Sequence, residues 1–339
     1  MGPNSRYTRL EKLLGDLDVA NTHGLEIGAL STPVVRTPHA NIRFVDHADQ
    51  ASLRAKYAND PNVVIDDIMR VDEVWGDRTL AECFPGESFD YVIASHVIEH
   101  VPDVIGWLAE IANVLRPGGR LILAIPDRRY TFDVLRRETS LADLIDSHFR
   151  AARRPTPGQI FDCNANVANF THQDGWTEHK PGQEPARFAT RAYALSRAEK
   201  SRDGEYIDCH CSVFTACSLL ELLDGLLELG MFPFRLERFH VACFGTNEMS
   251  LVLIREPDGS AAAAARPAFR LLLEEAVDSE GLSLDTILAE AAPNQQPEDA
   301  RVAQFQQALS DMKASTSWRM TAPLRAIARR LGFARKSVQ

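Results

Sequence analysis

Short apolar runs alternate with amphipathic stretches along the first 256 residues of the chain. Runs of this length fit buried strands, and stretches with apolar residues three or four positions apart fit helices that cover a sheet. Their alternation predicts an α/β domain with a largely parallel sheet. The pattern gives seven strands, at residues 23–29, 42–46, 63–67, 90–95, 120–126, 235–241 and 249–255.

Helices fit between several of these strands. The apolar spacing predicts them at residues 51–58, 104–115 and 216–229. The sequence Arg116-Pro117-Gly118-Gly119 ends the second helix, because proline cannot continue a helix and glycine readily adopts the left-handed conformation of a helix end.

Residues 128–205 interrupt this rhythm with arginine, proline, histidine and aromatic residues, directly after the fifth predicted strand. A long insertion at the carboxyl end of a parallel sheet usually covers a ligand crevice. We therefore expect this insertion to form a lid and an acceptor site within one domain, residues 1–256.

The composition changes after residue 256. Residues 257–300 are typical of a linker with one short helix, and residues 301–339 form a basic tail with an amphipathic helical pattern. Apolar positions in the tail recur at helical spacing, at Met320, Leu324, Ile327 and Leu331. A basic face opposite an apolar one can lie on anionic lipid, contact a membrane-bound glycosyltransferase or dock on the protein's own body.

Composition and charge restrict the class of protein. The chain has 339 residues, 45% of them hydrophobic and 25% charged, which is typical of a soluble globular protein. It has no apolar run long enough to cross a bilayer and no secretory signal at its start, so we expect it in the cytoplasm. Its formal net charge of −10 argues against nucleic-acid binding. Six irregularly spaced cysteines predict free thiols.

Acidic residues close three successive predicted strands. Glu26 and Gly28 end the first strand, Asp46 ends the second and Asp67 ends the third. A glycine lets a ligand approach the backbone closely, and a strand-end carboxylate can accept both hydroxyls of a ribose. Each acid also has a plain alternative role, since Asp often caps a helix and Glu26 can face solvent.

The segment 88–101, SFDYVIASHVIEHV, is followed by a predicted helix and then by LRPGGRL at 115–121. With the turn at Gly28 and the strand-end acids, it resembles the class I S-adenosylmethionine-dependent methyltransferases of the methyltransferase type 11 group. The turn at residues 26–33 is also similar to that of polysaccharide-biosynthesis methyltransferases. The resemblance implies a Rossmann-like sheet of order 3-2-1-4-5-7-6 with an antiparallel seventh strand.

The resemblance also implies how S-adenosylmethionine binds. It assigns Glu26, Gly28 and Ala29 to the methionine end, Asp46 to the ribose, Asp67 and Ile68 to the adenine, and Ser95 and His96 to the pocket below it. The chain departs from the family's glycine-rich turn, because Leu30 and Thr32 stand where glycines are usual.

Three histidines are candidates for catalysis. His96 and His100 follow the fourth predicted strand, where either could remove a proton from an acceptor hydroxyl or could serve only in capping and packing. His210 follows the insertion and could face the substrate or be structural. In an extended segment, Asp208 and His210 share one face and could bind a divalent metal with a further histidine. Nothing in the sequence fixes a third ligand, so we expect no metal site.

Arg128, Arg129 and Tyr130 follow the fifth predicted strand, where acceptors usually enter this fold. Two guanidinium groups can clamp a phosphate or a carboxylate, and plain surface solvation is the alternative. We take these three residues as candidates for binding an anionic acceptor, either a small molecule or a glycan.

The resemblance implies an O-methyltransferase that acts on a sugar or glycan intermediate in surface polysaccharide biosynthesis. The tail at residues 314–331 also resembles tails of glycosyltransferases and companion methyltransferases of that pathway. A non-catalytic cofactor-binding subunit of a glycan-assembly complex is the main alternative. A nicotinamide-dependent enzyme fits less well, because the chain has neither a full GxGxxG nor a Tyr-x-x-x-Lys pair in this region.

Overall fold

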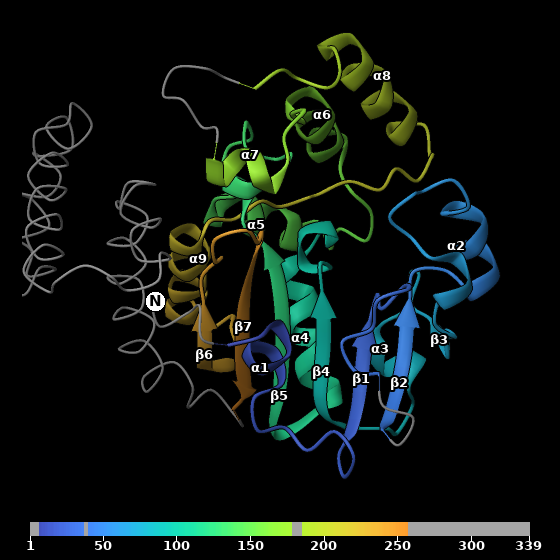
Figure 1. Ribbon diagram of the computed structural model, residues 1–339, viewed down its shortest axis with the longest axis vertical. Helices are drawn as coiled ribbons and strands as arrows, with labels where there is room; N and C mark the ends of the chain where they lie inside the picture. The colour runs from blue at the N-terminus through green and yellow to red at the C-terminus, as the bar shows by residue number, and fades with distance from the viewer. Residues whose placement is uncertain (1–6, 37–39, 178–184, 257–339) are drawn as a thin grey trace, which may run out of the picture. The chain divides into compact units, whose positions relative to one another are not determined.

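The computed structural model describes residues 7–36, 40–177 and 185–256 (Figure 1). These residues belong to one compact unit, Asn4–Ala276. The predicted linker at 257–300 and the predicted tail at 301–339 lie outside the described residues.

A seven-stranded sheet forms the centre of the domain (Figure 1). Its strand order, β3-β2-β1-β4-β5-β7-β6, confirms the predicted fold class. The strand pairs within the run β3-β2-β1-β4-β5 are all parallel. β7 runs antiparallel to both of its neighbours, β5 and β6. The strands are β1 (His23–Ile27), β2 (Asn41–Asp46), β3 (Glu73–Val74), β4 (Phe89–Ser95), β5 (Leu115–Pro126), β6 (Phe234–His240) and β7 (Glu248–Arg255).

Helices flank the sheet and continue beyond its carboxyl edge. The α-helices are α1 (Arg9–Leu14), α2 (Gln50–Lys56), α3 (Leu80–Cys83), α4 (Val104–Val114), α5 (Leu141–Phe149), α6 (Pro157–Asn166), α7 (His172–Thr177), α8 (Arg191–Arg202) and α9 (Ala216–Glu228). The short 3₁₀ helices in the described ranges are η2 (Ile65–Asp67), η3 (Ile98–His100) and η4 (Arg128–Tyr130). The three helices predicted from apolar spacing are α2, α4 and α9, with ends that differ by at most two residues.

The central strands alternate their side chains between two apolar layers. On one face, Val92 and Leu121 pack in the cluster that includes Trp107 of α4 and Leu223 of α9. On the other face, Tyr91 and its neighbours pack with Leu13 of α1. Successive strand residues point to opposite faces, so a strand covered on both sides reads as one continuous apolar run.

The third predicted strand, at residues 63–67, is wrong. Residues 65–67 form η2, none of whose side chains is buried, and Val64 is 59% exposed. The apolar run there is therefore not a buried strand. The actual strand β3 is two residues long and pairs with Val45 and Asp46 of β2. Asp72, directly before β3, holds the start of this strand against β2, because its carboxylate accepts a hydrogen bond of 2.9 Å from the backbone N–H of Phe44. Asp67 is therefore not at a strand end.

The insertion at 128–205 divides into two parts. Leu144 of α5 is buried in the same apolar cluster as α4 and α9, so this helix belongs to the main core. α6 packs against α8, and Ile160 of α6 forms a separate small cluster with Ile207, Cys209 and Cys211. In Figure 1, α6 and α8 lie beyond the carboxyl ends of the strands. Only the later part of the insertion thus has the position of a lid.

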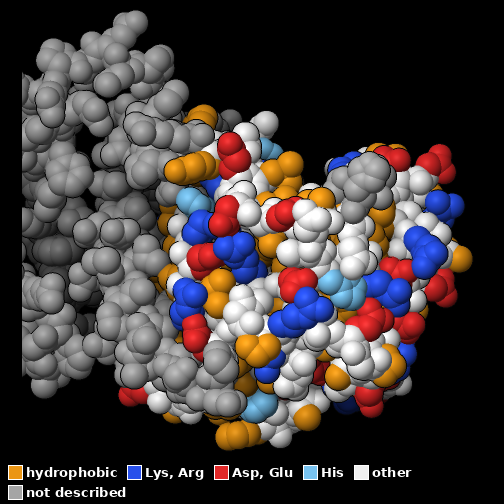
Figure 2. Space-filling view, turned by 90° about the horizontal axis from the view of Figure 1, so that it is seen from below, with side chains coloured by type: hydrophobic (Ala, Val, Ile, Leu, Met, Phe, Trp, Pro, Cys, Tyr) orange, Lys and Arg blue, Asp and Glu red, His pale blue; other side chains and the backbone are white. Residues whose placement is uncertain are grey.

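The face at the amino ends of the parallel strands has mixed charge. Figure 2 shows acidic and basic side chains interspersed over the described part of this face. Ion pairs join strand starts there, as between Arg116 and Asp90.

None of the helices in the described ranges combines the length and the apolar composition needed to cross a bilayer.

Candidate active site

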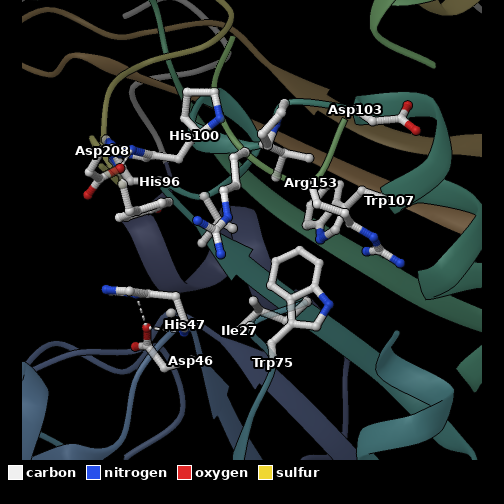
Figure 3. A pocket seen from close by; sticks show the side chains of 18 of the residues that line it. Ile27, Asp46, His47, Trp75, His96, His100, Asp103, Trp107, Arg153 and Asp208 are labelled. Atoms are coloured by element: carbon white, nitrogen blue, oxygen red, sulfur yellow. Dashed lines mark hydrogen bonds and ion pairs between the residues drawn. The ribbon is translucent and has the colours of Figure 1, made fainter. Parts of the chain in front are cut away.

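A cavity of about 880 Å³ opens at the carboxyl ends of β1, β2 and β4 (Figure 3). Residues that follow these strands line it, together with Arg9 of α1, the loop at 151–155 and Tyr206 and Asp208 after the insertion. In Figure 3, Asp46, His47 and Trp75 form one group of lining side chains, and His96, His100 and Asp208 form another.

The turn after β1 brings backbone to the cavity wall. Gly28 has a φ of +68°, and a Cβ on it would come within 2.9 Å of Val97 Cγ2. Leu30, which replaces a glycine of the family turn, also adopts a left-handed conformation, with a φ of 45°. Gly28, Leu30 and Thr32 all line the cavity. The turn thus has two left-handed residues, Gly28 and Leu30, although the second is not a glycine.

Glu26 is buried beside this turn and holds the backbone that follows it. It is 1% exposed and does not line the cavity. Its carboxylate accepts hydrogen bonds from the backbone N–H groups of Val34 at 2.7 Å and Val35 at 3.4 Å. Burial raises the pKa of Glu26 to about 7 and outweighs these two hydrogen bonds, which favour the ionised form. Ala29 also lies outside the main cavity, beside a smaller hollow under the turn.

Asp46 at the end of β2 lines the cavity and is 7% exposed. Its Oδ1 accepts hydrogen bonds from the backbone N–H of His47 at 2.7 Å and lies 2.6 Å from the Nδ1 of the same histidine. Its Oδ2 makes no hydrogen bond with any residue in the described part of the chain. A held carboxylate with one oxygen left for a ligand suits the hydroxyls of a ribose.

Asp67 and Ile68 lie outside the cavity lining, in contrast to the prediction. Asp67 is exposed, and the carbonyl oxygen of Ile68 accepts a hydrogen bond from Gln50. The position after the true third strand belongs to Trp75, Gly76 and Asp77, all of which line the cavity. Residues 63–67, to which the strand-end rule was applied, do not form the third strand.

Ser95 and His96 line the cavity at the end of β4, as predicted. Arg9 joins them to β7, because it donates to Ser95 Oγ at 2.7 Å and to Glu248 Oε1 at 2.7 Å. Glu248 Oε2 lies 3.0 Å from His96 Nε2. Burial alone would raise the pKa of Glu248, but His96 and Arg9 lower it to about 2. Nothing in the sequence near β4 indicated that Arg9 and Glu248 lie here.

His100 and His210 form a second group, each with its own carboxylate. His100 Nδ1 is 2.9 Å from Asp208 Oδ1, and His210 Nδ1 is 2.5 Å from Asp133 Oδ2. The two rings lie edge to face with centroids 4.7 Å apart. Burial would lower the pKa of His100, but its hydrogen bond to Asp208 and the charge of Asp208 raise it. His100 and Asp208 line the cavity, whereas His210 is not among the residues that line it.

The cluster Arg128, Arg129 and Tyr130 is not part of the cavity lining. Arg129 Nη2 is 2.5 Å from Asp127 Oδ2, Arg128 donates to a backbone carbonyl, and Tyr130 stacks on Trp176 with ring centroids 3.9 Å apart. The cavity instead receives Arg153 and Arg154 from the loop after α5. Arg153 Nη1 lies 2.6 Å from Glu110 Oε1.

The strand order and this cavity define a class I methyltransferase architecture. Residues 17–225 match the family model described as a methyltransferase domain, and the chain belongs to this family. S-adenosylmethionine is its cofactor.

Individual relatives are similar over shorter or more distant stretches. A ubiquinone biosynthesis O-methyltransferase of Bradyrhizobium sp. (strain ORS 278) is 42% identical over 52 residues, which are 15% of this chain and 21% of that protein. The match thus spans about a fifth of that curated relative. An S-adenosylmethionine-dependent methyltransferase structure from Mesorhizobium loti is 14% identical over 70% of this chain and 92% of that one, with a TM-score of 0.34. One from Methanosarcina mazei is 15% identical over 70% and 93%, with a TM-score of 0.30.

Proposed function

We propose that this protein transfers the methyl group of S-adenosylmethionine to a hydroxyl group of a small-molecule or glycan acceptor. The observation that carries the proposal is the composition of one cavity. It has a glycine turn and a strand-end carboxylate toward the cofactor, and imidazoles with paired carboxylates beside them.

The residues present fit the cofactor. At Gly28 the backbone reaches the cavity wall, and a Cβ there would collide with Val97. Asp46 is held by His47 and retains one oxygen for a ribose. Trp75 and Asp77 replace Asp67 and Ile68 as the candidates beside the adenine.

The chain's own groups then have to orient the acceptor and take its proton. S-adenosylmethionine supplies an electrophilic methyl group when it is bound, and in-line approach of the acceptor oxygen provides much of the acceleration. His96 and His100 line the cavity and are the candidate bases. Glu248 and Asp208 fix the orientations of these two rings.

We propose further that the acceptor is a sugar or glycan intermediate in surface polysaccharide biosynthesis. The support is the similarity of the turn at residues 26–33, and of the tail, to proteins of that pathway. The curated relative favours oxygen as the methylated atom, because it is named an O-methyltransferase. The acceptor is anionic in this proposal, with Arg153 and Arg154 as its candidate partners in place of Arg128 and Arg129.

Incubation with methyl-labelled S-adenosylmethionine and a panel of hydroxyl acceptors tests the proposal. The panel includes nucleotide sugars, phosphorylated sugars and phenols. We expect label in a sugar product whose mass rises by one methylene, and S-adenosylhomocysteine in equal amount. Transfer to phenols alone would reject the glycan acceptor. Tight cofactor binding with no transfer to any member would favour the non-catalytic subunit.

A further inference from the structure

We propose that Glu99, His100 and His210 form a binding site for a divalent metal ion beside the cavity. The three residues each offer a ligand atom, and these atoms lie within 4.8 Å of one another. They come from η3 and from the segment after the insertion, which the fold brings together. Metal binding here does not depend on the proposed function, although the role given to the metal below does.

Glu99 supplies the strongest reason to place a cation here. It is 1% exposed, and neither carboxylate oxygen has a hydrogen-bond partner in the described part of the chain. The nearest titratable side chain is His96, whose Nδ1 is 3.6 Å from Oε1. A buried carboxylate without partners is costly, so such a group usually meets a metal, a cation or a proton donor.

The backbone of Glu99 also fixes the third ligand in place. Its carbonyl oxygen accepts hydrogen bonds from the N–H groups of Cys211 at 2.6 Å and Ser212 at 3.1 Å. His210 directly precedes these two residues, so it is held against η3 although it is far from Glu99 in the sequence.

Both imidazoles are oriented as metal ligands usually are. Asp208 accepts from His100 Nδ1, and Asp133 accepts from His210 Nδ1. A histidine that donates from Nδ1 carries its lone pair on Nε2, and a carboxylate behind the ring increases the basicity of that nitrogen. The two carboxylates are held in turn, Asp208 by Lys56 at 3.0 Å and Asp133 by Arg136 at 2.9 Å.

Two nitrogens and one carboxylate oxygen favour zinc or another first-row divalent ion over calcium or magnesium, which prefer oxygen ligands alone. An ion at the centre of the three atoms requires each to move inward by less than about 1 Å to reach a bond length of about 2.1 Å. From the sequence, Asp208 and His210 are candidate ligands, and no metal site is expected. The structure places Asp208 behind His100, where it orients a ligand.

Of the three proposed ligands, His100 lines the cavity, which places the site at the cavity wall. A hydroxyl oxygen bound to the metal loses its proton more readily. In the proposed methyl transfer, that proton passes to His96, the new C–O bond forms, and the departing sulfur keeps the electron pair of the broken C–S bond. His100 is then a ligand, and His96 remains as the base.

The test is direct metal binding to the full-length protein after removal of metals with a chelator. Cobalt(II) serves as the spectroscopic probe, and zinc(II) is titrated against a chromophoric chelator. We expect one equivalent to bind. Glu99→Gln and His210→Gln should each weaken binding at least tenfold, and Asp133→Asn should weaken it about 10- to 100-fold.

His148→Gln is the matched control. Its Nδ1 also faces a carboxylate, 3.2 Å from Asp103, yet it belongs to no group of possible metal ligands within the described ranges. This variant should bind metal as the wild type does. Thermal unfolding establishes that each variant is folded. If a Glu99→Gln variant loses its fold, His210→Gln and Asp133→Asn still decide the question.

Calorimetry with S-adenosylmethionine separates the two proposals. A folded protein that binds the cofactor but no stoichiometric metal overturns the metal site and leaves the proposed function standing. Metal binding that Glu99→Gln and His210→Gln do not weaken also overturns it. Stoichiometric metal binding without transfer to any hydroxyl acceptor supports the site and rejects the proposed function.

Discussion

At the scale of single residues, Glu26 combines burial with a titratable group. Burial raises the pKa of Glu26 to about 7 from an ordinary value of 4.5. The folded protein therefore keeps a proton that the unfolded chain releases between these values. The contribution to stability is fully present below pH 4.5 and is lost as the pH rises through 7, a change of about 3 kcal/mol.

Glu26→Gln should remove this pH dependence, because the amide cannot ionise. The variant should gain stability relative to the wild type between about pH 5 and about pH 8, by up to about 3 kcal/mol. Urea unfolding of both proteins at both pH values measures the difference in stability between them. The other titrating groups are the same in the two proteins, so their contributions cancel. A stability difference that is the same at both pH values would contradict the shifted pKa.

The pairing of carboxylates with histidines lies beyond sequence reasoning of this kind. His100 and Asp208 are 108 residues apart, and His210 and Asp133 are 77 apart. No local spacing relates residues so distant, so their contact depends on where the insertion returns the chain to the sheet. By contrast, Gly28, Asp46 and Ser95 each lie at the end of a parallel strand, and parallel strands bring their ends to one edge.

At the scale of elements, α5 is the informative case, since the insertion that contains it was expected to be a lid. Leu144→Ala removes a side chain that is 3% exposed in the main core. The free energy of unfolding should fall by about 2–5 kcal/mol. Phe149→Ala, in the same helix but 80% exposed, should change it by less than about 0.5 kcal/mol. Urea unfolding compares them, and equal effects would place α5 outside the core.

The accuracy of the predicted elements followed their length. α4 and α9 have long apolar faces that fit only a helix against a sheet, and both were predicted within two residues. β3 has two residues at the sheet edge, too few to show a pattern, so the apolar run at 63–65 was taken instead. That error placed Asp67 and Ile68 at the expected strand end, whereas Trp75 and Asp77 follow the actual strand and line the cavity.

At the scale of the whole molecule, the tail differs in charge from the rest of the chain. From Met312 onward the chain has seven Lys and Arg residues and no acid, which is a formal charge of +7. The rest of the chain therefore carries −17, since the net charge is −10. We propose weak, salt-sensitive attachment of this segment to the cytoplasmic face of a membrane or to a membrane-bound partner. The segment lies outside the described residues, and the proposal depends on its sequence pattern alone.

Flotation with anionic liposomes tests the lipid branch of this proposal. The intact protein should float at low salt and less at high salt, since each Lys or Arg adds about 1 kcal/mol near an anionic surface. A truncated protein that ends at Asp299 should stay at the bottom while it binds S-adenosylmethionine unchanged. Equal flotation of the two proteins would reject lipid binding by the tail.

The central claim is that S-adenosylmethionine binds in the cavity at the carboxyl ends of β1, β2 and β4, and calorimetric titration of three proteins tests it most directly. Asp46→Ala should weaken binding by about 1–3 kcal/mol relative to the wild type, because the ribose hydroxyls lose a charged acceptor. Asp67→Ala removes an exposed carboxylate outside the cavity and should bind as the wild type does. Unchanged affinity in a folded Asp46→Ala variant, or no binding to the wild type, would contradict the account.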